Sequence, residues 1–485
     1  MSDFETVIGV EVHARLLTRT KLFCRCSTEP SPPNTRTCPT CLGLPGALPA
    51  LNGAAVAMAV RAGLALECSI NTTSRFDRKS YFYPDLPKGF QCTQHALPIA
   101  ERGSIDLDRV MGRDHASAKS GPVRIRRIHL EEDAAKSVHD ATVGRSLVDF
   151  NRSGAPLIEI VSEPDLRSAA DASDYLRALR SALMFIGVND GNLEDGSFRC
   201  DVNVSVRPVG ESSLGARCEL KNINSFRFVA RAIELESRKQ REALSRGEGV
   251  QQCTKQYNAE RDDTVLLREK GEAEDYRYFA EPDLPSLLVP ESMIERERAA
   301  VGERPWDKRE RFQQALGGSR ESAETLIEHP ALARYFERVI ALGAAPLRAA
   351  NFIVNELRRG VAYDGLEANF PLDEPRLVAL LALVERAVIS PKAAKELYRT
   401  MVSDRGDRRS PAEIVEAQGR AMIDDDALIE AACAEVIRDN PRQADSFRRG
   451  KMGILGFLVG AVMAATDGRA APEKVNAALL RLLQR

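Results

Sequence analysis

Strict alternation of polar and apolar residues in two short segments most constrains the fold of this chain. In residues 7–15, Glu11 and His13 are separated and flanked by apolar residues, and in residues 201–207 valine occupies every second position. Because the side chains of a strand point alternately to its two faces, each segment is expected to form a strand with one polar face. A solvated face of an antiparallel sheet would explain this pattern without any further function.

The residue types on these polar faces favour chemistry. Asp and Asn are disfavoured in strands, whereas a solvated strand face usually carries Thr, Lys, Arg or Glu. The second segment nevertheless contains Asp201 and Asn203. The alternation returns in residues 217–221, which place Glu219 and Lys221 on one face. On pattern alone, a solvated face and a functional face both remain open.

The periodicity of the sequence changes near residue 295. A chain of 485 residues is expected to form two or three domains. Before residue 295, short strand-like runs alternate with turns, and two long helices are expected, over residues 168–186 and after Ser225 as a candidate N-cap. Beyond it, most segments have helical periodicity. The predicted fold class is α+β: a mostly antiparallel sheet domain with flanking helices, followed by an all-α region.

The junction between these parts is rich in charge. Residues 295–311 contain the only tryptophan, Trp306, and we interpret them as a linker or a first exposed helix. Over the whole chain, 68 basic and 70 acidic residues nearly balance. Any contact with nucleic acid must therefore come from a local basic patch.

No feature of the sequence indicates export or a membrane. Residues 1–5 lack the basic start and apolar core of a secretory signal. The longest apolar stretch, residues 454–465, is too short to span a bilayer. We expect a soluble cytoplasmic protein without membrane contact.

Four of the ten cysteines form a compact group in residues 24–41, namely Cys24, Cys26, Cys38 and Cys41. In a reducing cytoplasm, two close cysteine pairs joined by a short loop favour tetrahedral zinc. Four thiolates leave no open position, so the zinc would be structural. The alternative is a loop of four free thiols, since the first pair has only one residue between its cysteines, fewer than is usual.

Carboxylates in two further segments complete a possible metal site. Residues 129–136 contain three carboxylates, among them Glu132, and Glu159 stands alone in an apolar strand. A buried carboxylate is costly unless it meets a cation, a metal or hydrogen-bond donors, and a structural salt bridge would serve equally well. Oxygen ligands from Glu11, Glu132 and Glu159, with His13 beside them, suit Mg²⁺ carrying nucleotide phosphates better than a catalytic zinc.

Basic residues could hold such phosphates. The candidates are Arg78, Lys79 and Lys221, although each alone is compatible with a solvated surface. The sequence contains neither a Gly-x₄-Gly-Lys-Ser/Thr loop nor a Gly-x-Gly-x-x-Gly motif. A nucleotide would therefore have to be held by the face of the sheet itself.

Several long motifs, in one order, resemble those of the GatB family of aspartyl/glutamyl-tRNA amidotransferases. They are residues 7–13, 76–85, 129–133, 151–154, 156–165, 199–203 and 219–226, together with residues 456–460 and 475–476 near the end. The resemblance covers the whole chain. It implies a catalytic cradle domain over residues 1–295 with a zinc-binding loop at 24–41, a helical domain over 296–408, and a YqeY-like, tRNA-binding tail over 409–485.

The resemblance implies a heterotrimer with the GatA amidase and the GatC subunit. This complex would convert Glu-tRNA(Gln) to Gln-tRNA(Gln), Asp-tRNA(Asn) to Asn-tRNA(Asn), or both. ATP would phosphorylate the side-chain carboxylate, and ammonia from glutamine hydrolysed in GatA would arrive through a channel and displace the phosphate. Phosphoryl transfer needs a metal and a cradle more than a protein nucleophile. The implied cofactors are ATP, Mg²⁺ and a structural Zn²⁺.

The resemblance also assigns roles to individual residues. Those that would hold Mg²⁺ are Glu11, His13, Glu132 and Glu159, and those that would line the same cradle are Asp201, Asn203, Glu219 and Lys221. In the tail, the candidates for tRNA phosphate contacts are Arg448, Arg449 and Lys451, although a short basic cluster is often only solvated. The sequence departs from the family pattern at Ala135, Ala280 and Ala464. None of these removes a proposed metal ligand, but Ala464 removes a lysine that could contact phosphate.

Two other functions remain open from the sequence. A non-catalytic tRNA-binding scaffold predicts no loss of amidation when Glu132 or Glu159 is replaced by alanine. A free-standing metal-dependent hydrolase predicts turnover by the isolated chain without ATP.

Overall fold

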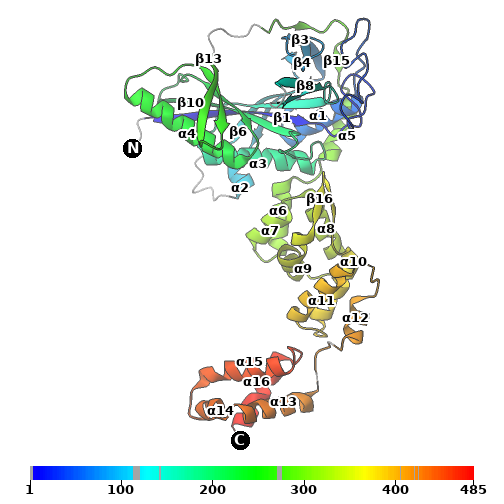
Figure 1. Ribbon diagram of the computed structural model, residues 1–485, viewed down its shortest axis with the longest axis vertical. Helices are drawn as coiled ribbons and strands as arrows, with labels where there is room; N and C mark the ends of the chain where they lie inside the picture. The colour runs from blue at the N-terminus through cyan, green and yellow to red at the C-terminus, as the bar shows by residue number, and fades with distance from the viewer. Residues whose placement is uncertain are drawn as a thin grey trace. The chain divides into compact units, whose positions relative to one another are not determined.

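The chain divides into two compact units, Met1–Glu310 and Arg311–Arg485 (Figure 1). The structure is a computed structural model that describes residues 4–112, 121–140, 144–269, 276–404, 406–419, 421–423 and 425–484. The first unit is built on a large sheet, and the second consists mainly of helices. The predicted α+β fold class is confirmed.

A 13-stranded sheet organises the first unit. The strands on its main path are, in order, β13 (Asp263–Glu269), β12 (Cys253–Asn258), β11 (Cys218–Ile223), β10 (Phe198–Pro208), β1 (Phe4–Arg15), β9 (Pro156–Ser162), β6 (Val123–Glu132), β4 (Phe90–Leu97), β3 (Thr73–Ser80) and β14 (Phe279–Ala280). Three short strands lie off this path: β2 (Ser69–Ile70), β5 (Ala100–Ile105) and β15 (Leu287–Leu288). Among the described strands of this sheet, only β11 and β12 pair in parallel.

The first strand of the chain, β1, lies in the middle of this sheet. It pairs antiparallel with β10 on one side and with β9 on the other. Its apolar side chains Ile8, Val10 and Val12 are buried, whereas Glu11 and His13 lie on the opposite, partly open face. The alternation read from the sequence therefore separates a core face from a polar face, as expected.

Helices cover the apolar face and bury it. The core beneath the sheet includes side chains from α1 (Gly53–Ala65), α3 (Ala169–Phe185) and α4 (Phe226–Ser245). Each fully buried aliphatic side chain contributes about 1.5–3 kcal/mol to folding. The two long helices begin where the sequence predicts, because the hydroxyls of Ser168 and Ser225 accept hydrogen bonds from the first turns of α3 and α4.

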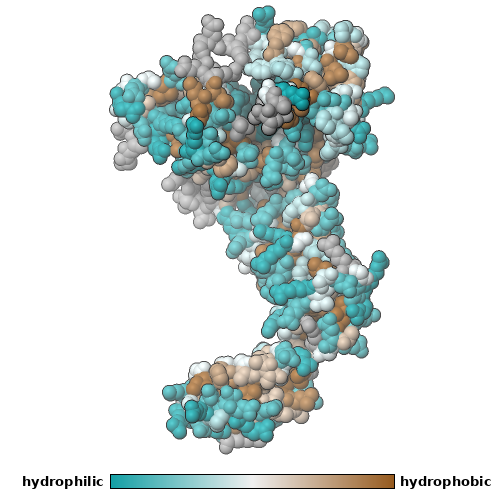
Figure 2. Space-filling model, viewed as in Figure 1, coloured by the Kyte–Doolittle hydropathy of each residue, from teal (hydrophilic) through white to brown (hydrophobic). Residues whose placement is uncertain are grey.

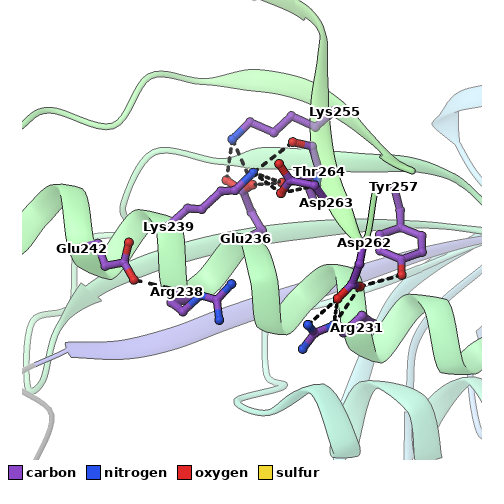
Figure 3. Close-up of polar contacts among 10 residues, drawn as sticks. All are labelled: Arg231, Glu236, Arg238, Lys239, Glu242, Lys255, Tyr257, Asp262, Asp263 and Thr264. Carbon is purple, nitrogen blue, oxygen red and sulfur yellow. Dashed lines mark hydrogen bonds and ion pairs between the residues drawn. The ribbon is translucent and has the colours of Figure 1, made fainter. Parts of the chain in front are cut away.

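Polar contacts fasten α4 to the strands at one edge of the sheet (Figure 3). The Glu236 side chain is 1% exposed, and its carboxylate accepts hydrogen bonds from Lys255 Nζ at 2.9 and 3.0 Å. Thr264 Oγ1 donates to the same carboxylate at 3.1 Å. Further along α4, Arg231 pairs with Asp262 at the turn between β12 and β13. These contacts fix the edge hairpin on the helix.

The segment around Trp306 is helical and partly buried. It forms α5 (Glu291–Val301) and the start of α6 (Pro305–Ala315). Trp306 is only 6% exposed and packs in the core of the first unit. Of the two interpretations offered by the sequence, the helical one holds, but the tryptophan faces inward because its ring finds apolar neighbours there.

The second unit is helical with one addition. Its helices are α7 (Arg320–Leu326), α8 (Pro330–Ala341), α9 (Pro346–Phe352), α10 (Glu374–Glu385), α11 (Pro391–Ser403), α12 (Pro411–Ala417), α13 (Asp426–Asp439), α14 (Pro441–Arg448), α15 (Leu455–Ala465) and α16 (Pro472–Leu483). A short hairpin of β16 (Ala362–Asp364) and β17 (Glu367–Asn369) interrupts the expected all-α pattern. Gly365, with φ at +57°, makes the tight turn between the two strands possible.

The last helices have a core of their own. α13, α15 and α16 contribute most of its buried side chains, including Cys433, Leu458 and Leu479. The opposite side of α15 is open, and Figure 2 shows apolar and neutral residues gathered there. In the described parts of the chain, every helix is too short or too polar to cross a membrane.

Candidate active site and zinc loop

Three neighbouring strands bring two histidines and two carboxylates together on the polar face. His13 on β1 lies directly across from Glu159 on β9, and Glu159 lies across from His129 on β6. Glu159 Oε2 is 3.4 Å from Nε2 of both histidines. Glu131, two residues after His129, completes the group, because its carboxylate oxygens lie 3.4 Å from His13 Nε2 and 3.7 Å from His129 Nε2.

These groups balance one another's charge in a largely buried place. Burial opposes the charged form of His13, but the hydrogen bond to Glu159 and the charge of Glu131 raise its pKa to about 9. His129 is likewise buried, and the same two carboxylates raise its pKa to about 9. The pKa of Glu159 is held well below its usual value by both histidines, against the effect of burial. The pairing therefore keeps Glu159 ionised.

Glu11 extends the group toward β10. Its Oε1 lies 3.6 Å from His13 Nε2, and it stands across from Asp201 in register. Burial and the charge of Glu159 raise the pKa of Glu11 to about 7. A carboxylate that keeps its proton so readily lacks sufficient positive charge nearby.

Two sets of three side chains here could hold a cation. One consists of Glu11, His13 and Asp201, and the other of His13, Glu131 and Glu159, with the ligand atoms of each set within 4.8 Å of one another. Carboxylate oxygens are the preferred ligands of Mg²⁺. The donor set and the raised pKa of Glu11 both fit a divalent cation at this place.

The four other predicted cradle residues also meet on this face. Lys221 Nζ lies 2.6 Å from Asp201 Oδ2 and 3.0 Å from Glu219 Oε1. Asn203 lies across from Glu219 in the pairing of β10 with β11. Asp201 and Glu219 raise the pKa of Lys221 although burial opposes this. Lys221 is therefore a firmly charged cation held by two carboxylates.

The cysteine loop has the geometry of a metal site. The Sγ atoms of its four cysteines lie within 4.8 Å of one another. Tetrahedral zinc with Zn–S bonds of about 2.3 Å requires thiolates about 3.8 Å apart. The buried Lys21 places Nζ 3.5 Å from Cys41 Sγ. A hydrogen bond from Cys24, assisted by the charge of Lys21, lowers the pKa of Cys41 to about 4. The loop thus favours thiolate and fits zinc.

Comparisons with known proteins match these features. A family described as the GatB/GatE catalytic domain matches residues 6–295, and one described as the GatB domain matches residues 334–483. The chain belongs to the GatB family. The sequence-based recognition is thereby confirmed, and the helical tail fits the second of these matches.

Individual members of the GatB family are similar along their whole length. A protein of Anaeromyxobacter dehalogenans is 49% identical over 490 residues, covering 100% of this chain and 99% of the relative. A protein of Thermodesulfovibrio yellowstonii is 45% identical, covering 99% and 100%, and one of Myxococcus xanthus is 45% identical, covering 100% and 99%. All three carry the name of the GatB-type subunit of an aspartyl/glutamyl-tRNA(Asn/Gln) amidotransferase.

In this member of the GatB family, Glu132 lies apart from the predicted ligands. Successive side chains of a strand point to opposite faces, so Glu131 reaches the polar face and Glu132 turns away. The Glu132 carboxylate forms an ion pair with Lys88 and accepts a hydrogen bond from the Cys92 amide at 3.3 Å. The structure brings Glu11, His13 and Glu159 together, and it places Glu131 where the sequence suggested Glu132.

The sequence analysis overlooked His129 and Glu131 as members of the site. The signal was present, because residues 127–131 alternate between polar Arg127, His129 and Glu131 and apolar side chains, as β1 does. Reading this alternation through to its end would have selected Glu131 over its neighbour.

The two predicted phosphate-binding residues of β3 point to opposite faces. Arg78 forms two hydrogen bonds of 2.7 Å with the buried carboxylate of Glu281, so its charge is already compensated. Lys79 Nζ lies 4.7 Å from the ring centre of Tyr276 and 5.8 Å from that of Tyr81. Within the described residues, no carboxylate forms an ion pair with Lys79. Of the two, Lys79 has the freer charge.

The three basic candidates of the tail lie at the end of α14. Arg448, Arg449 and Lys451 are all exposed. Arg448 is paired with Asp445 at 3.3 Å. The exposed cluster is therefore accessible, and part of its charge is compensated within the helix.

Proposed function

We propose that this chain is the subunit of a tRNA-dependent amidotransferase that activates and amidates a misacylated amino acid. The side-chain carboxylate of Glu-tRNA(Gln) or Asp-tRNA(Asn) takes the γ-phosphoryl group of ATP. Ammonia then attacks the acyl phosphate, an amide bond forms, and phosphate leaves. The observation that carries this proposal is the cluster of His13, His129, Glu131 and Glu159, extended by Glu11, on an otherwise apolar strand framework.

The cluster would hold Mg²⁺ through Glu11, His13, Glu131 and Glu159. A bound Mg²⁺ neutralises the phosphate charge that grows during transfer. Glu159 remains ionised because its two histidine neighbours hold it so, and it therefore offers a ready ligand. Glu132 was also expected among these ligands, and its contribution is a separate test, given below.

Cations on both sides of the cluster would orient the nucleotide phosphates. Lys79 is the candidate on the β3 side, and Lys221 is the candidate on the β11 side. Asp201 and Glu219 hold the Lys221 ammonium in place, and Asn203 lines the same face beside them. A point charge of this kind can bind phosphate without a glycine-rich loop.

The other functions would be supplied by partners and by the rest of the chain. Ammonia would come through a channel from glutamine hydrolysed in a GatA amidase, and a GatC subunit would complete the heterotrimer in the cytoplasm. The cysteine loop would bind a structural zinc. The tail would contact tRNA through Arg448, Arg449 and Lys451, because phosphate contacts from exposed basic residues dominate affinity for nucleic acid.

The test is conversion of Glu-tRNA(Gln) to Gln-tRNA(Gln), measured for this chain with and without its partners and with free ammonia in place of glutamine. We expect conversion to require ATP, Mg²⁺ and this chain, and Asp-tRNA(Asn) should be tried in parallel. Failure with both tRNAs would instead support a tRNA-binding scaffold. Turnover by the isolated chain without ATP would support a metal-dependent hydrolase.

A further inference from the structure

An aromatic wall lies beside Lys79 at the β3 edge of the candidate active site. Tyr81 and Tyr276 meet edge to face with ring centres 5.9 Å apart, and Tyr276 meets Tyr278 in the same way at 6.3 Å. Tyr278 then stacks on His95 of β4, with ring centres 3.9 Å apart and an angle of 14° between the rings. The wall therefore ends in two parallel rings.

This stacked pair is open to solvent. Tyr278 is 39% exposed, and His95 is exposed as well. Burial and the nearby charge of Arg127 lower the pKa of His95, so its ring is neutral at pH 7. Two uncharged, parallel and accessible rings offer the kind of surface on which a nucleobase stacks.

The pair also lies close to the acidic cluster. Burial, together with the charges of Glu159, Glu131 and Glu11, raises the pKa of Tyr278 to about 12. Arg127 connects the two places, because it shares a face of β6 with His129 and Glu131 and donates a hydrogen bond to the His95 carbonyl at 3.4 Å. Its Nε atom is buried, and no described residue accepts a hydrogen bond from it. A ligand oxygen would satisfy that donor.

We propose that His95 and Tyr278 form a platform on which an adenine base stacks, with the attached phosphate groups directed toward Arg127 and the acidic cluster. This inference rests on the proposed function, which requires a nucleotide on this face. Two adenines come to such a site: the base of ATP and the terminal base of tRNA. A stacking platform also explains how a base is held on a sheet face that has no glycine-rich phosphate loop.

The experiment compares Tyr278→Leu and Tyr278→Phe in the complete complex, supplied with ammonia. Loss of a stacking ring is expected to raise a KM about tenfold, whereas phenylalanine should retain most of the affinity. If the base belongs to ATP, KM for ATP rises and the preference for ATP over CTP falls. If it belongs to tRNA, KM for the misacylated tRNA rises and KM for ATP is unchanged.

A matched control is Tyr363→Leu. Tyr363 is similarly exposed and lies against His329 with ring centres 4.3 Å apart, but it belongs to the second unit. This variant should leave both KM values unchanged. The platform is overturned if Tyr278→Leu changes neither KM, if Tyr278→Phe is as defective as Tyr278→Leu, or if Tyr363→Leu has the same effect.

Failure of the platform can be separated from failure of the proposed function. If the wild-type complex does not convert either tRNA, equilibrium binding of fluorescent ATP and of deacylated tRNA to wild type and Tyr278→Leu is compared directly. Weaker binding of one ligand by the variant would still support the platform. Equal binding of both ligands by the two proteins would overturn it.

Discussion

Glu159 is the residue on which the candidate active site depends most. One of its oxygens lies 3.4 Å from two histidines on two different strands, and the carboxylate is almost fully buried. A charge in such a place is stable only because its partners are fixed by strand pairing. The chemistry of the site is therefore built into the register of β1, β9 and β6.

The adjacent glutamates of β6 allow a direct test of the metal assignment. We expect Glu131→Gln to lower the rate of ammonia-dependent amidation by about 100-fold or more, because a metal that neutralises transition-state charge is worth several kcal/mol. The Mg²⁺ concentration needed for half-maximal rate should rise in the same variant. Mg²⁺ titration of the amidation rate measures both effects.

The comparison variant is Glu132→Gln, which has the same chemical change one residue later. It should remove the ion pair with Lys88 but leave the Mg²⁺ requirement unchanged. A raised Mg²⁺ requirement in Glu132→Gln alone would instead restore the assignment made from the sequence.

Much of the site could be predicted at the residue scale, and the exception is informative. The alternation in β1 and β10 identified Glu11, His13, Asp201 and Asn203, which the structure places on one face. The choice between the two glutamates depends on which face each reaches, and this is set by the pairing of β6 with β9. The contacts of Tyr278 with His95 join segments far apart in sequence, so no local pattern could have shown them.

At the scale of elements, two small structures are stabilised by polar groups in place of a large apolar core. One is the cysteine loop, and the other is the β12–β13 hairpin on α4. Their helices and strands follow from local signals such as the Ser225 cap, whereas the partners of Glu236 do not. Lys255 and Thr264 could be assigned to Glu236 only once the hairpin was placed against the helix.

The cysteine loop should contain zinc, at about one ion per chain. We expect Cys41→Ser to reduce the zinc content and lower the melting temperature while leaving the Mg²⁺ requirement of the remaining activity unchanged, since the metal is structural. Elemental analysis and thermal unfolding measure these effects. Cys68→Ala, which removes a buried cysteine outside the loop, should keep the zinc content of the wild type. Full zinc content in Cys41→Ser would contradict the assignment.

Glu236 should make stability depend on pH. Burial raises its pKa, but the hydrogen bonds from Gln240 and Lys255 outweigh this, so the folded pKa lies below the ordinary 4.5. Its contribution is therefore complete above pH 4.5 and is lost as the pH falls through the lowered value. Glu236→Gln should cost roughly 2 kcal/mol at pH 7, and this loss should shrink in acid.

Urea unfolding at several pH values tests this expectation. The control is Glu242→Gln on the same helix, whose exposed carboxylate lies 4.0 Å from Arg238 and should contribute less than about 0.5 kcal/mol. Equal losses in the two variants at pH 7 would show that the buried pair has no special weight.

For the whole molecule, the tail should affect binding and not chemistry. Replacing Arg449 and Lys451 by glutamine is expected to raise KM for the misacylated tRNA without changing kcat. Each lost phosphate contact should also reduce the slope of log affinity against log salt by about 0.7–0.9. Arg448, already paired with Asp445, should contribute less.

The control for the tail is Lys474→Gln, which removes a lysine that is paired with Asp426 at 3.0 Å. It should leave KM for tRNA unchanged. An unchanged KM in the Arg449 and Lys451 variant would leave tRNA recognition to other parts of the chain.

The central position of β1 determines when this protein can become active during its synthesis. β1 leaves the ribosome first, but its two neighbours begin only at Pro156 and Phe198. Until Pro208 has emerged, Glu11 and His13 have no partners and the apolar side of β1 has no complete sheet to join. Such non-local pairing delays folding and exposes apolar surface to aggregation. We expect stalled nascent chains that end before Phe198 to be digested rapidly by protease, and chains that extend beyond Ser245 to resist.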